Sequence, residues 1–218
     1  VGKDFAISIK MNSTDFQKGG FSPEDSIKVA KLFSDSGIDN IEISGGTYEQ
    51  PRLLGLDKVS INPKRSERRK ESTIAREAYF LSYAEEISEV VNIPLMVTGG
   101  FRTKEGMEAA LADGACEIVG VGRPLCANPY AIKELLVGQI NELPKYEKTL
   151  SIGPWWLSPT SPFRLIQAIN AFSAQAWFYQ QIKKMGKGLM PDLTLKPWKA
   201  FRKDARADQE AIKEYQNF

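Results

Sequence analysis

The stretch between Pro94 and Pro124 constrains the fold of this chain more than any other. It contains two short apolar segments, residues 94–98 and 117–121, and the chain between them has room for only one short helix. A helical crossover is the usual connection between parallel strands, whereas antiparallel strands are commonly joined by tight turns. The stretch therefore predicts a strand, helix, strand unit whose two strands run parallel.

Glycines follow both of these predicted strands. Gly99 and Gly100 come directly after the first strand, and Gly122 follows the second. At the carboxyl ends of parallel strands, bare backbone N–H groups and the positive ends of following helices attract anions. Arg123 adds a fixed cation whose planar fork of donors fits phosphate oxygens. The pattern predicts a phosphate site, although such glycines also serve simple turn geometry.

The same alternation of strand and helix extends to both sides of this stretch. Predicted strands cover residues 5–11, 40–44, 94–98 and 117–121, and predicted helices begin near Ser22, Ser72, Thr103 and Asn128. This order predicts an α/β fold with right-handed parallel connections. Four such units are half of an eight-fold TIM barrel, in which the loops after the last two strands are a frequent phosphate site. Half a barrel leaves open sheet edges, so we expect the chain to need its missing half or a second copy of itself, as in a homodimer.

Composition excludes several classes of partner. A formal net charge of +2 is too small to indicate nucleic-acid binding. No apolar run approaches the roughly 20 residues of a membrane span, and the amino end lacks the layout of a signal peptide, so a cytoplasmic protein is expected. The chain starts at Val1 and reaches its first predicted strand almost at once, so we expect it to be a piece of a longer protein.

The supply of reactive side chains is equally restrictive. The two cysteines, Cys116 and Cys126, form no close-spaced ligand group, so neither a disulfide framework nor a metal site is expected. The chain contains no histidine. This excludes a Ser-His-Asp triad, a histidine-ligated metal and a histidine proton donor, unless a second polypeptide supplies the residue.

Two basic features leave alternatives open. Lys10 is the charged residue near the carboxyl end of the first predicted strand, where it is either a solvated strand end or a ligand contact. The long loop Thr47–Glu71 carries a basic cluster that either meets a phosphorylated ligand or is simply solvated. Its members are Lys64, Arg65, Arg68, Arg69 and Lys70.

The chain changes character after Asn141, where several prolines mark irregular structure. Residues 162–184 predict an amphipathic helix, and residues 202–215 predict a charged final helix. The predicted apolar side of the first helix comprises Leu165, Ile166, Ile169, Phe172, Trp177 and Ile182. Its aromatic residues are read as core or interface rather than as a ligand cage. We therefore predict two domains: a half-barrel over residues 1–138 and a helical extension over residues 139–218.

Four stretches occur in one order along the chain: IKMNSTDFQKGGF (Ile9–Phe21), ESTIAREAYF (Glu71–Phe80), VTGGFRT (Val97–Thr103) and VGVGRPLCANP (Val119–Pro129). Together they resemble the old yellow enzyme family of FMN-dependent oxidoreductases, and especially its fungal NADH:flavin oxidoreductase members. The resemblance extends to about residue 138. It implies that the chain corresponds to strands five to eight of that family's barrel.

The resemblance also implies roles for individual residues. Lys10 matches a family cation that lies against the N1 and C2-carbonyl side of the flavin, where a positive charge stabilises the reduced ring. Gly99, Gly100, Gly122 and Arg123 match the family's cradle for the FMN phosphate. The implied activity is that of an ene-reductase, in which hydride passes from NAD(P)H to FMN and then to a small-molecule activated alkene.

Other family features are absent from this sequence. The His/His or His/Asn pair and the tyrosine proton donor belong to the first half of the family's barrel, so no catalytic residue is expected in this chain. No cysteine cluster follows the barrel, which places the chain with the simpler branch. Two alternatives stay open: an incomplete half-barrel that binds FMN or phosphate and acts by dimerising or by pairing with another chain, and a different phosphate-binding barrel enzyme such as an aldolase or isomerase.

Overall fold

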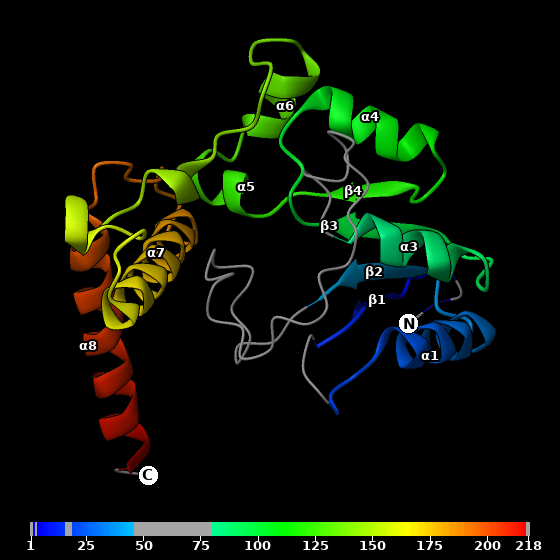
Figure 1. Ribbon diagram of the computed structural model, residues 1–218, viewed down its shortest axis with the longest axis horizontal. Coiled ribbons are helices and arrows are strands. Elements are labelled where there is room, and N and C mark those ends of the chain that lie inside the picture. Colours follow the sequence, from blue (N-terminus) through cyan, green and yellow to red (C-terminus); the bar gives the residue numbers. More distant parts are fainter. Residues whose placement is uncertain (1, 3, 16–18, 46–79, 217–218) are drawn as a thin grey trace. The chain divides into compact units, whose positions relative to one another are not determined.

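The computed structural model describes residues 2, 4–15, 19–45 and 80–216 (Figure 1). These residues fall into two compact units. The first runs to Gly122 and includes Leu135–Leu143, and the second comprises Arg123–Glu134 and the chain from Pro144 onward. No helix in the described ranges has the length and apolar character that a membrane crossing needs. The predicted domain boundary after residue 138 stays a prediction.

A four-stranded parallel sheet forms the centre of the first unit. Its strands are β1 (Ser8–Asn12), β2 (Asn40–Ser44), β3 (Leu95–Thr98) and β4 (Ile118–Gly120), and they pair in that order. Figure 1 shows the strands side by side in this sequence order. The predicted parallel α/β arrangement is therefore confirmed. β1 begins later than predicted, because pairing with β2 starts at Ser8.

Three described helices of this unit follow from local sequence signals. They are α1 (Pro23–Asp35), α3 (Leu81–Ser88) and α4 (Lys104–Ala112). Ser22 and Asp25 form a reciprocal capping box at the start of α1, and Thr103 caps α4 by accepting a bond from Gly106 N at 3.1 Å. The loop predicted at 47–71 and the first part of the helix predicted from residue 72 lie outside the described residues.

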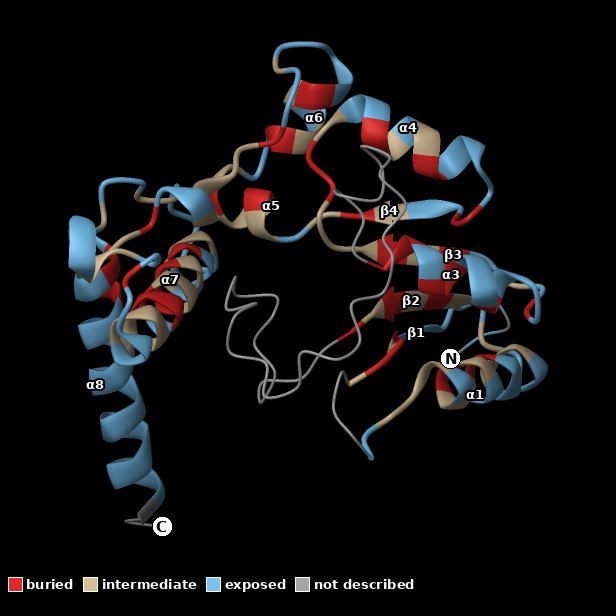
Figure 2. Cartoon of the chain, in the orientation of Figure 1, coloured by how far each residue is buried: buried red, intermediate tan, exposed pale blue. Residues whose placement is uncertain are grey.

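Alternate strand residues build the core of the first unit. Ile41, Ile43, Leu95 and Val97 are buried, whereas the residues between them are not fully buried. They pack in one cluster with helical residues such as Ala30, Ala84, Ile87 and Ala110. Figure 2 shows this burial concentrated on the sheet and on the inner sides of the helices. Burying one such aliphatic side chain contributes about 1.5 to 3 kcal/mol, so this face holds the sheet to its helices.

The second unit is helical and has a smaller core. Its helices include α5 (Arg123–Ala127), α7 (Arg164–Met185) and α8 (Pro197–Gln216), with the 3-10 turns η3 (Tyr146–Lys148) and η4 (Trp155–Leu157). Helix α6 (Ala131–Leu136) spans the border between the units. The core cluster of the second unit consists of the buried residues Ala127, Leu150, Ala176, Trp177 and Ala200. Helix α5 was not predicted, and α8 begins five residues before the predicted start, at Pro197 rather than Arg202.

The predicted extent of the long helix agrees with α7, but its predicted apolar side is wrong in part. Leu165, Phe172 and Ile182 are 71%, 56% and 45% exposed. Asn170, Ser173 and Gln181 are buried instead, together with Trp177. Gln181 is accommodated because its side chain accepts a hydrogen bond from Asp192 N at 2.6 Å and donates one to Asp192 O at 3.1 Å. A buried polar side chain with its bonds satisfied costs little, so apolar periodicity alone did not identify this face.

Candidate functional site

The strand residues that alternate with the buried core point to the opposite side of the sheet. We call this side the open face, because it lies opposite the apolar face that packs with the helices of the first unit. Its members are Ser8, Lys10, Asn12, Asn40, Glu42, Ser44, Met96, Thr98, Ile118 and Gly120. The face is mostly polar, in contrast to the aliphatic core behind it. This polarity distinguishes the open face from the side of the sheet that packs with the described helices of this unit.

Lys10 lies on the open face and forms an ion pair with Glu42. The parallel register places the two residues opposite each other on β1 and β2. Lys10 Nζ donates to Glu42 Oε1 at 2.6 Å, and the side chains are 54% and 20% exposed. Sequence reasoning did not single out Glu42. The signal was present, because Glu42 is the charged residue between two isoleucines in the strand that follows β1.

The environment of Glu42 favours its ionised form. Burial raises the pKa of Glu42, but the hydrogen bond from Lys10, the nearby Thr98 hydroxyl and the charge of Lys10 together outweigh that effect. The pKa of Glu42 therefore lies below its ordinary value. Lys10 is the partner that the geometry supports, since the buried Oγ1 of Thr98 has no hydrogen-bond partner among the described residues.

Gly120 makes room for Thr98 on the neighbouring strand. The two residues are register partners on β4 and β3. A Cβ built at Gly120 would overlap Thr98 Oγ1 and would lie 2.7 Å from Met96 Cε. Any larger residue at this position would therefore displace two side chains of the open face.

Gly99 and Gly100 follow β3 in a backbone conformation that other residues rarely adopt. Their φ angles are 128° and 91°, and both residues are half-buried. The glycines at these two positions are thus required by the turn itself. At Gly122, by contrast, no described heavy atom lies within 4 Å of an added Cβ, so packing does not require glycine there. The backbone conformation of the turn at Gly99 and Gly100 suits the close approach of a phosphate.

The two arginines of this region differ in setting. Arg123 begins α5 in the second unit and is half-buried there. Arg102, which sequence reasoning did not single out, belongs to the first unit and is only 6% exposed. Its Nη1 donates to Phe101 O at 2.7 Å, and its own carbonyl accepts a bond from Leu143 N at 2.7 Å. Arg102 therefore anchors the segment that follows the glycine turn.

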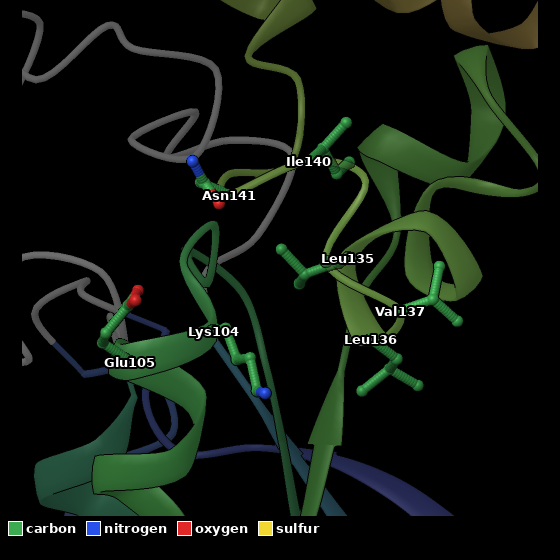
Figure 3. A pocket seen from close by; sticks show the side chains of 8 residues that line it. Lys104, Glu105, Leu135, Leu136, Val137, Ile140 and Asn141 are labelled. Carbon is green, nitrogen blue, oxygen red and sulfur yellow. The ribbon is translucent and has the colours of Figure 1, made fainter.

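A separate pocket of the first unit lies between the start of α4 and the end of α6 (Figure 3). Its volume is about 370 Å³, and it is lined by Lys104, Glu105, Leu135, Leu136, Val137, Gly138, Ile140 and Asn141. Figure 3 shows the Lys104 side chain extending toward the side where Leu136 lies, whereas Glu105 lies apart from the apolar side chains. None of the predicted site residues lines this pocket, and its polar groups do not converge. We do not assign it to the candidate site.

Comparison with known proteins places these features in a family context. No family model matches the chain. It is 37% identical over 141 residues to the NADH-dependent flavin oxidoreductase iliE of Hypocrea jecorina (strain QM6a), covering 62% of this chain and 32% of that protein. It is 31% identical over 185 residues to the NADH oxidase of Thermoanaerobacter brockii, covering 84% and 26%.

One solved structure supports the fold. A complex of 2-naphthoyl-CoA reductase with 2-naphthoyl-CoA superimposes with a TM-score of 0.51 at 24% identity, over 65% of this chain and 20% of that chain. The chain thus spans a third or less of each protein compared here. Across that span, the chain is homologous to proteins named NADH-dependent flavin oxidoreductase and NADH oxidase, in agreement with the flavin-oxidoreductase resemblance of its four stretches.

Proposed function

We propose that the chain provides the second half, strands 5 to 8, of a TIM barrel in an FMN-dependent NAD(P)H oxidoreductase of the ene-reductase type. The observation that carries this proposal is the open face, with Lys10 on it and the Gly99–Gly100 turn at the carboxyl end of β3. Residues of these types suit the two ends of FMN, since an ammonium group suits the electron-rich ring and bare amides suit the phosphate.

The half-barrel proposal is supported by the edges and faces of the sheet. Within the described residues, β1 pairs only with β2, and β4 pairs only with β3, so each has one unpaired edge. Exposed parallel edges are unfavourable in an isolated domain, and closing a barrel removes them. In a closed barrel the open face becomes the interior. The missing strands come from the first half of a longer chain.

The residues of this chain have distinct tasks toward FMN. In this proposal, backbone amides of Gly99, Gly100 and Gly122 would hold the phosphate, and the family resemblance assigns the guanidinium of Arg123 to the same group. Lys10 would place its ammonium group beside the N1 and C2-carbonyl side of the ring, where a positive charge would stabilise negative charge on the flavin. When bound, FMN supplies hydride transfer from NAD(P)H to an activated alkene. The residues that orient the alkene and donate its proton belong to the missing half.

Reconstitution tests this proposal directly. We would combine the chain with residues that supply the first barrel half, add FMN, remove unbound flavin, and measure flavin absorbance and NAD(P)H consumption. The expected result is a yellow protein that oxidises NAD(P)H with an activated alkene as acceptor. A complete barrel that binds no FMN would overturn the proposal, and a yellow preparation would exclude an aldolase or isomerase.

Arg123→Ala provides the first variant for this assay. If Arg123 holds the phosphate, FMN binding weakens by about 1.5 to 3 kcal/mol, the usual scale for a hydrogen bond to a charged group. Arg206→Ala, an exposed arginine of α8, is the matched control and should leave the affinity unchanged. Equal FMN affinity of the Arg123 variant and the parent would show that Arg123 does not hold the phosphate.

A second candidate function is a half-barrel that dimerises and binds FMN or another phosphate ester without reducing alkenes. The two sheet edges that are unpaired within the described ranges favour it, because a second copy would pair them as well as a missing half would. Sedimentation of the chain distinguishes the two. A two-fold dimer with phosphate affinity and no reductase activity favours this candidate, whereas a well-folded monomer contradicts it.

A further inference from the structure

We propose that Glu42 is a positioning residue that fixes the ammonium group of Lys10 and sets how much positive charge Lys10 presents to the flavin. This inference rests on the proposed function, since it concerns the same site. It adds a residue that neither the resemblance nor the comparisons assign.

The isolation of the pair is the first step of the argument. Among the residues of the open face, only Lys10 and Glu42 carry charge. Toward β3, the side chains beside Glu42 are those of Met96, its register partner, and Thr98, both uncharged. Each member of the pair is therefore the dominant electrostatic influence on the other within this sheet.

The second step concerns geometry. A lysine side chain has four rotatable bonds and ends in a small, strongly hydrated charge, so by itself it does not hold one position. The 2.6 Å bond to Glu42 Oε1, from a register partner on the adjacent strand, ties the ammonium group to the sheet. Partly exposed pairs of this kind contribute little to stability. Stability alone therefore gives little reason for a carboxylate to lie beside a cation on this face.

The third step concerns charge. An ionised Glu42 partly cancels the field of Lys10 at any group bound on the open face. Reduced flavin carries negative charge on its N1 side, so the carboxylate opposes reduction while Lys10 favours it. Reduced flavin must still pass its hydride onward. Glu42 would therefore limit how strongly Lys10 stabilises the reduced form.

The test uses two variants of the reconstituted enzyme and one matched control. Glu42→Gln keeps the size and the hydrogen-bond acceptor but removes the charge, so we expect about a tenfold shift of the flavin equilibrium toward the reduced form. For a two-electron couple this is about 30 mV upward in reduction potential. Lys10→Met should shift the potential downward. Glu85→Gln removes the same charge from the exposed side of α3 and should leave the potential unchanged.

A second measurement needs no flavin. In the chain as it stands, the Glu42 carboxyl is titrated by carbon NMR with and without Lys10→Met. Because the bond and charge of Lys10 hold the pKa of Glu42 down, that pKa should rise in the variant. An unchanged pKa of Glu42 in Lys10→Met would overturn the pairing of Lys10 with Glu42.

The two measurements separate the possible failures. If FMN binds but Glu42→Gln shifts the potential no more than Glu85→Gln, the inference is overturned while the proposed function stands. If the complete barrel binds no FMN, both are overturned, and the titration then shows whether the pair remains as a purely structural contact.

Discussion

The two units bury their side chains by different means. The core of the first unit is built from aliphatic residues on alternate strand positions, such as Ile41, Ile43 and Leu95, packed with helical residues. The core of the second unit surrounds a single large side chain, Trp177, with alanines and a leucine. Around it, buried Asn170 and Gln181 bond to backbone groups of neighbouring segments.

This difference explains where pattern analysis works in this chain. Apolar residues at regular spacing identify a face when the hydrophobic effect alone decides which side is buried. In α7 the buried side includes amides whose hydrogen bonds are satisfied by chain segments many residues away, and those bonds leave no periodic signal. The core of the first unit is therefore stabilised mainly by burial of apolar surface. The core of the second unit depends on one aromatic anchor and a set of specific polar contacts.

The sharpest way to break this comparison is to remove the aromatic anchor. Trp177 is 1% exposed, lies with its ring centroid 5.2 Å from Phe178, and donates from Nε1 to Leu195 O at 2.7 Å. Trp177→Ala should destabilise the second unit by about 3 to 5 kcal/mol, measured by denaturant unfolding. Trp155→Ala, at a position 87% exposed, is the control, with an expected change within about 0.5 kcal/mol. Similar losses of unfolding free energy for both variants would show that Trp177 is not the anchor of this core.

Ile43→Ala tests the aliphatic core in the same way. Ile43 is fully buried in the middle of the sheet, so its truncation should cost about 2 to 5 kcal/mol through lost burial and the cavity left behind. The comparison of the two units predicts that Ile43→Ala destabilises the first unit. Hydrogen exchange of the sheet amides can follow this loss of stability. Ile212→Ala, 57% exposed on α8, serves as control. A small effect of Ile43→Ala would contradict the assigned core.

Gln181→Ala tests the polar contacts of the second unit. The change leaves the amide and carbonyl of Asp192 without the bonds they make to the Gln181 side chain, at a cost of about 1 to 3 kcal/mol. Gln175→Ala, whose amide makes only a 3.5 Å contact with Tyr179 Oη, should cost less. Equal thermal stability of the two variants would show that the buried amide does not support the fold of this unit.

The smallest expected effect concerns acid stability of the first unit. Because Lys10 lowers the pKa of Glu42 in the folded chain, the pair contributes stability at neutral pH that is lost as the pH falls below the ordinary carboxyl range and through the folded value. Lys10→Met should therefore reduce the difference in unfolding free energy between neutral and acidic solution. Lys133→Met, an exposed lysine of α6, should not. An identical pH profile for Lys10→Met and the parent would contradict the pairing.

Much of the first unit could be predicted because its signals are local. Ser22, Pro23 and Asp25 begin α1, Gly37 follows its end, and the predicted strand 40–44 has the bounds of β2. Glu42 was missed as a site residue because its importance depends on register with Lys10, which no local pattern encodes. Helix α5 was missed because five residues are too few to show a helical period.

The sequence by itself determined the parallel order of strands and helices, the glycine turn after β3 and the resemblance to flavin oxidoreductases, because each of these depends on residues close together in the chain. Only the tertiary structure decided that Glu42 is the partner of Lys10, that Gly120 makes room for Thr98, and which side of α7 is buried. These features depend on contacts between segments that are distant in sequence, and the free energy of such contacts is set by the geometry in which the segments meet.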